Sequence, residues 1–105
     1  MPRTVIRRQL ARTDIEQAAA YYFDTAGLAV AERFVVAVET AAAHAATHPE
    51  AGSVRYAQAL DRPGLRFWTV KGFPYLVFYR DGGDCLDVWR VLHAERDIPA
   101  WLREE

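Results

Sequence analysis

The feature that most constrains the fold is a long amphipathic segment, residues 28–47. Its apolar residues recur at helical spacing, and most of them are small: Ala31, Phe34, Val35, Val38, Ala41, Ala42 and Ala45. Charged and polar residues such as Glu32 and Glu39 occupy the other face, and Pro49 prevents the helix from continuing. The segment therefore predicts a helix whose small-residue stripe must be covered by another part of the chain.

A second helical pattern precedes this segment. Thr13-Asp14-Ile15-Glu16 has the form of a capping box, in which the Thr hydroxyl and the Glu side chain satisfy free amides at a helix start. An apolar stripe that we expect to be buried follows at Ile15, Ala18, Ala19, Tyr22 and Phe23, and Gly27 ends it. Because the turn at Gly27 is short, we expect the two helices to form an antiparallel hairpin.

The rest of the chain has the residue types of strands. We expect a short strand at residues 4–6, a loop at 53–63, strands at 65–70, 75–79 and 85–92, and a short helix at 97–102. Residues 71–74 and 81–84 read as turns, so the last three strands are antiparallel. The order strand–helix–helix–strand–strand–strand with a helical tail predicts a two-layer α+β domain, with the helix hairpin packed on a mainly antiparallel sheet.

Composition limits the functional classes. The chain has 105 residues, so we expect one domain over residues 1–105. Thirteen basic residues against fourteen acidic ones leave a net charge of −1, without the basic surplus typical of proteins that grip nucleic acid, although a local cluster is compatible with it. No apolar run is long enough for a membrane span, and Cys85 is the only cysteine. These features predict a cytoplasmic protein without disulfides.

Several motifs, taken in order, resemble the RelE/ParE family of bacterial toxin–antitoxin toxins, also called plasmid stabilisation proteins. They are Asp14-Ile15, residues 48–52 (HPEAG), residues 64–66 (GLR), residues 73–80 (FPYLVFYR), residues 91–93 (VLH) and Arg96-Asp97. The resemblance extends over nearly the whole chain. It implies the same α+β fold and a cognate antitoxin, often of the ribbon-helix-helix type with a tail that wraps the toxin. Operator DNA would then be contacted only through the antitoxin.

The family implies two different activities. RelE-type toxins cut mRNA on the ribosome, whereas ParE-type toxins poison DNA gyrase. Basic residues of the RelE-type nuclease site fall at Arg66, Trp68, Tyr75 and near Ala94 here, and only Arg66 keeps the charge. We therefore expect a ParE-like, protein-binding poison of gyrase. The alternatives are an mRNA endonuclease and a toxin that has lost its activity.

The resemblance and the charge pattern assign contacts with a target or antitoxin to Arg66, Tyr75, Arg80, Arg90, His93 and Arg96. His93, placed after the last strand, is the one candidate for acid–base catalysis, since imidazole titrates near neutral pH. The pattern favours the alternative interpretation, a hydrogen-bonded, structural histidine at the end of a strand. We expect Arg66, Arg80 and Arg90 to form a patch at one sheet edge. The alternatives are solvation, or pairing with Asp61, Asp84 or Asp87.

The remaining candidate residues give weaker functional signals. His44 and His48 have helical ligand spacing but no evident third ligand, and Cys85 reads as a small apolar residue, so we expect no metal and no cofactor. The strand aromatics, among them Phe67, Phe78 and Trp89, read mostly as core. Some of them should lie on the sheet face away from the helices, where an antitoxin tail would cover them.

Overall fold

The computed structural model describes residues 2–58 and 60–102. The elements, in chain order, are β1 (Thr4–Arg7), α1 (Gln9–Ala26), α2 (Leu28–Thr47), the 3-10 helix η1 (Pro49–Ala51), β2 (Arg66–Thr69), β3 (Tyr75–Asp81), β4 (Cys85–His93) and α3 (Ile98–Leu102). The predicted element order and α+β class are confirmed. Three strands end later than predicted: β1 includes Arg7, β3 extends to Asp81, and His93 is the last residue of β4 instead of following it. β2 is one residue shorter than predicted at each end.

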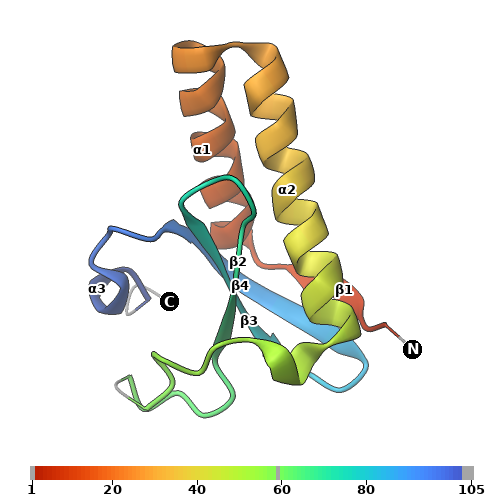
Figure 1. The fold of residues 1–105 in the computed structure, drawn as a ribbon. Coiled ribbons are helices and arrows are strands. Elements are labelled where there is room, and N and C mark those ends of the chain that lie inside the picture. The colour runs from red at the N-terminus through yellow and green to blue at the C-terminus, as the bar shows by residue number, and fades with distance from the viewer. Residues whose placement is uncertain (1, 59, 103–105) are drawn as a thin grey trace.

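The four strands form one sheet in the order β1-β4-β3-β2. β1 runs parallel to β4, and the other neighbouring pairs are antiparallel. The α1–α2 hairpin stands on one side of the sheet, while α3 and the coil after η1 lie on the other (Figure 1). Gly27 joins the two helices with φ 93°, a backbone conformation that favours glycine, so the predicted sharp turn is confirmed.

Apolar residues bury both faces of the sheet. Phe34 and Val38 of α2 pack with Val77 and Tyr79 of β3 in the cluster under the helix hairpin. The outer cluster on the opposite face contains Leu65, Leu76, Phe78, Trp89, Leu92, Ile98 and Leu102. The chain itself covers this face with Tyr56, Leu60 and Trp101. The expectation that an antitoxin tail must cover the outer-face aromatics is therefore wrong, because the coil and α3 do so.

The start of α1 also differs from the prediction. The helix begins at Gln9, so the Thr13–Glu16 pattern lies inside it and does not form a capping box. Asp14 has a different role. Its Oδ2 accepts hydrogen bonds from the Arg90 Nε at 2.8 Å and the Val91 amide at 3.0 Å, and its Oδ1 accepts from the Arg90 Nη2 at 2.9 Å.

The position of this ion pair follows from the sheet. β1 ends at Arg7, which pairs with Val88, so the continuing edge of β4 meets the first turns of α1 instead of a strand. Asp14 takes the place of a strand partner for Val91. The side chains of Arg90 and Asp14 are only 3% and 9% exposed, so each buried charge is compensated by the opposite charge of the other.

We expect Asp14→Ala to lower the free energy of unfolding by about 3–5 kcal/mol, because it leaves the Arg90 guanidinium buried without its carboxylate. Urea unfolding followed by circular dichroism measures this. The double variant Asp14→Leu with Arg90→Met should lose less than the single variant, since no buried charge remains. A single-variant loss below about 1 kcal/mol would show that the pair does not hold α1 on β4.

Candidate functional site

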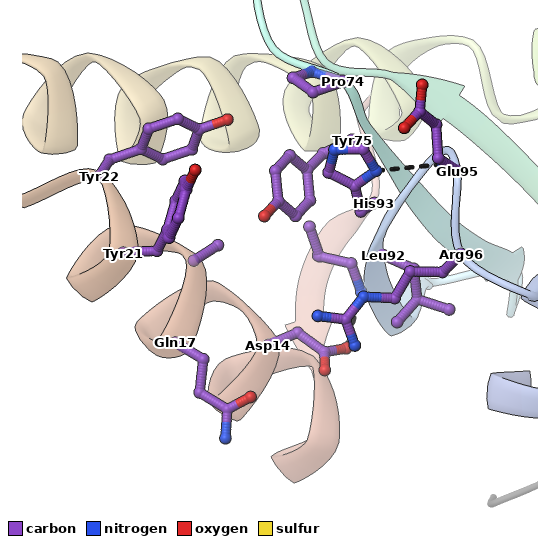
Figure 2. Close-up of a pocket in the computed structure, with 12 residues that line it drawn as sticks. Asp14, Gln17, Tyr21, Tyr22, Pro74, Tyr75, Leu92, His93, Glu95 and Arg96 are labelled. Atoms are coloured by element: carbon purple, nitrogen blue, oxygen red, sulfur yellow. Dashed lines mark hydrogen bonds between the residues drawn. The ribbon is translucent and has the colours of Figure 1, made fainter. Parts of the chain in front are cut away.

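A hollow of about 520 Å³ opens where α1 meets the ends of β3 and β4. We refer to it as the tyrosine pocket. Its lining residues are Asp14, Gln17, Ala18, Tyr21, Tyr22, Pro74, Tyr75, Val91, Leu92, His93, Glu95 and Arg96. Figure 2 shows Tyr21 and Tyr22 on α1 together with Tyr75 and His93 from the sheet. The pocket thus brings together three of the predicted site residues, Tyr75, His93 and Arg96.

Tyr75 and His93 are partners across the β3–β4 pair. Their rings meet edge to face, with centroids 5.2 Å apart. The His93 Nδ1 accepts a hydrogen bond from the Glu95 amide at 3.1 Å, drawn as the dashed line in Figure 2. A neutral imidazole that accepts at Nδ1 carries its proton on Nε2. In this arrangement Nε2 is a donor and not a base, which favours the structural reading of His93.

The tyrosines of the pocket are neutral hydrogen-bonding and stacking groups. Tyr22 lies 5.4 Å from Tyr21 and 6.3 Å from Tyr75, measured between ring centroids. Burial raises the pKa of Tyr75, an effect that the nearby Arg96 cation partly opposes, and burial also raises the pKa of Tyr22. Both phenols therefore keep their protons at neutral pH and do not act there as general bases.

The charges of the pocket do not form a phosphate clamp. Among the described residues, Arg96 is the one cationic side chain in its lining, and its guanidinium carbon lies 4.2 Å from the centre of the Trp101 ring. Two carboxylates, Asp14 and Glu95, also line the hollow, and Asp14 is already paired with Arg90. Stabilising a phosphate in a metal-free cleavage requires several cations directed at one point. The pocket is suited instead to aromatic and polar contacts.

Sequence reasoning missed most of this site. Tyr21, which is 59% exposed, was not predicted to belong to it, and Tyr22 was assigned only to the buried stripe of its helix. Phe23 is 54% exposed, so its assignment to the same buried stripe is wrong. Gln17 and Glu95 were not singled out either, although both line the pocket. The available signal was the Tyr21-Tyr22 pair at the end of an amphipathic stripe, because a second adjacent aromatic cannot also face the core of a single helix.

The three arginines predicted as one patch lie in different places, so that prediction is wrong. Arg66 donates to the Gly52 carbonyl at 2.8 Å, beside the Tyr79 hydroxyl that holds the Gly52 amide. Arg80 lies over Trp89 of the outer cluster. Arg90 is buried with Asp14. Alternation along β3 separates the first two, since Arg66 pairs with Tyr79 and not with Arg80.

A second, larger hollow of about 1130 Å³ lies between α2 and the β2–β3 turn. Val36, 61% exposed, Trp68 and Phe73 give it an apolar lining, and Arg33 and Lys71 are among its charged residues. His44 stacks on Trp68 in its wall, with ring centroids 6.2 Å apart. Within residues 2–58 and 60–102 no group of three His, Cys, Asp or Glu side chains could hold a metal ion, and no helix is long and apolar enough to cross a membrane.

Comparisons with known proteins match most of the chain. The family model described as "ParE toxin of type II toxin-antitoxin system, parDE" matches residues 5–98. The chain belongs to the ParE toxin family. A solved structure described as "Chromosomal ParDE TA system from P. aeruginosa" contains a chain with the same fold, at a TM-score of 0.62 and 17% identity, covering 89% of this toxin and 97% of that chain. A comparison with curated protein sequences finds no match.

The tyrosine pKa values predict how the stability of this ParE toxin depends on alkaline pH. Burial holds the pKa of Tyr75 above that of unfolded tyrosine, so the resulting stability is complete below about pH 10 and is lost as the pH rises through the folded value. Urea midpoints measured from neutral pH upward should fall less in Tyr75→Phe than in the unmodified toxin. Parallel curves would mean that Tyr75 ionises freely.

Proposed function

We propose that this ParE toxin inhibits growth by poisoning DNA gyrase and that a cognate antitoxin neutralises it. The observation that carries the proposal is the tyrosine pocket, whose described lining presents three tyrosines and one cation, Arg96, in place of a phosphate clamp. Tyrosine and arginine are enriched at the energetic centres of protein–protein interfaces. The pocket therefore supports a toxin that acts by binding a protein in the cytoplasm and not by cleaving RNA.

The larger hollow beside α2 supports the antitoxin part of the proposal. An exposed apolar surface on a small domain is characteristic of a protein-interaction site. Val36, Trp68 and Phe73 would receive apolar side chains. Among the described lining residues the cations Arg33 and Lys71 outnumber the one carboxylate, Glu32, which favours an acidic segment over a basic one. A wrapping tail attached to a ribbon-helix-helix domain would supply such a segment, and operator DNA would be contacted by the antitoxin alone.

We expect the purified toxin to inhibit ATP-dependent supercoiling by gyrase and to increase the amount of cleaved DNA held by the enzyme. Tyr21→Ala should raise the toxin concentration needed for half inhibition by about 30-fold, since truncating an interface aromatic costs about 2 kcal/mol. The matched control is Phe23→Ala, because Phe23 is 54% exposed on the same helix and does not line the pocket. Equal effects of the two variants would remove the pocket from the proposed interface.

The alternative activity is mRNA cleavage, which the position of His93 and Arg96 in one pocket would favour. We expect mRNA on translating ribosomes to stay intact when the toxin is added, because the pocket lacks several converging cations. Primer extension across the ribosomal A site measures this directly. Cleavage that disappears in His93→Ala would overturn gyrase poisoning as the activity and establish the nuclease in its place.

A further inference from the structure

Three arginines surround a single tryptophan on the sheet face opposite the helix hairpin. The guanidinium carbons of Arg8, Arg62 and Arg80 lie 4.8, 4.9 and 4.9 Å from the centre of the Trp89 ring. They come from three separate segments: the residue before α1, the coil between η1 and β2, and strand β3. We call this group the arginine–tryptophan cluster.

The local charge of the cluster is not balanced by the described part of the chain. Asp87 binds Arg8 through both carboxylate oxygens, at 3.1 and 2.8 Å, and also accepts from the Trp89 indole at 2.9 Å. Burial alone would raise the pKa of Asp87, but these hydrogen bonds lower it, so the carboxylate stays ionised. Both of its oxygens already accept hydrogen bonds from Arg8 or Trp89. Within residues 2–58 and 60–102, no carboxylate lies within ion-pair distance of Arg62 or Arg80.

Arg62 and Arg80 are held in place without an ion pair in the described chain, although Asp87, the partner of Arg80 across the β3–β4 pair, interacts with Arg80 at longer range. Arg62 donates one hydrogen bond, to the Leu102 carbonyl at 3.4 Å. Arg80 is flanked by the backbone at Gly64, where an added Cβ would lie 3.7 Å from its Cγ and Nε. Its buried Nε–H has no hydrogen-bond partner in the described chain. Two oriented guanidinium groups stacked on one ring present planar donors to an incoming anion, with little side-chain freedom left to lose.

We propose that the arginine–tryptophan cluster binds side-chain carboxylates of an acidic peptide segment in a partner protein. Carboxylates match the planar donor edge of guanidinium groups. A nucleic acid strand fits less well, because it requires a run of cations along its backbone. Here the cations converge on one ring and do not follow a line along the surface. The site is therefore suited to one or two carboxylates. This proposal holds whether or not the toxin poisons gyrase.

The test is fluorescence anisotropy with the full-length purified toxin and a labelled hexaglutamate peptide at low salt. We expect the hexaglutamate to bind at least about tenfold more tightly than hexaglutamine, and more weakly as the salt concentration rises. The variant Arg62→Gln with Arg80→Gln should lose about tenfold in affinity or more. The matched control is Arg55→Gln, since Arg55 belongs to the same coil and stacks on Tyr56 instead of Trp89.

The variants Arg62→Lys and Arg80→Lys keep the positive charge and are less disruptive than the Gln double variant. Thermal unfolding of each variant shows whether it is folded. Weaker binding in a folded lysine variant supports recognition by the planar guanidinium. Equal affinity for hexaglutamate in the Gln double variant and in Arg55→Gln would overturn the proposal. Tighter binding of a single-stranded oligonucleotide than of hexaglutamate would also overturn it. Supercoiling assays on the same variants measure gyrase inhibition independently of hexaglutamate binding, so a failure of one proposal can be told from a failure of the other.

Discussion

The buried pair of Arg90 and Asp14 is the interaction on which the rest of the structure depends. It joins residues 76 positions apart, at the point where β1 ends and α1 must continue along the edge of β4. Arg90 also donates to the Trp101 carbonyl at 3.0 Å, so the same guanidinium fixes α3. One arginine thus connects the helix hairpin, the sheet and the C-terminal helix. A carboxylate at this position also completes the hydrogen bonding of a strand edge that no strand covers.

This pair also determines the shape of the tyrosine pocket. Asp14 lies in the pocket wall one helical turn before Ala18 and two turns before Tyr21 and Tyr22. By binding Val91, it sets the distance between α1 and the last residues of β4. Both oxygens of the Asp14 carboxylate accept hydrogen bonds from Arg90. Asp14 therefore positions α1 against β4 and does not serve as an acid or base. The tyrosine pocket is therefore built on a buried ion pair between the helix layer and the sheet.

Local patterns predicted the elements well because each element has its own periodic signal. The stripe of residues 28–47, the Gly27 turn and the alternating strands gave the correct order of helices and strands. Long-range partners could not be predicted in this way. Thr13–Glu16 has the composition of a capping box, but the bond that Asp14 forms is with a residue far along the chain, and the helix starts before it. Covering of the outer face by the irregular coil was missed for the same reason.

The misplaced arginine patch has a more specific cause, a register shift in the β3–β4 pair. Phe78 pairs with Arg90 and Tyr79 with Val88, which leaves Trp89 as an additional residue in β4. Strict alternation would place Trp89 and Arg90 on opposite faces, whereas the bulge lets Trp89 join the outer cluster while Arg90 pairs with Phe78 of that same cluster. The guanidinium groups of Arg8, Arg62 and Arg80 then lie against the Trp89 indole. The guanidinium of Arg90 instead forms an ion pair with Asp14. A single extra residue therefore places Trp89 beside Arg8, Arg62 and Arg80, while the adjacent Arg90 forms the buried pair that holds the fold.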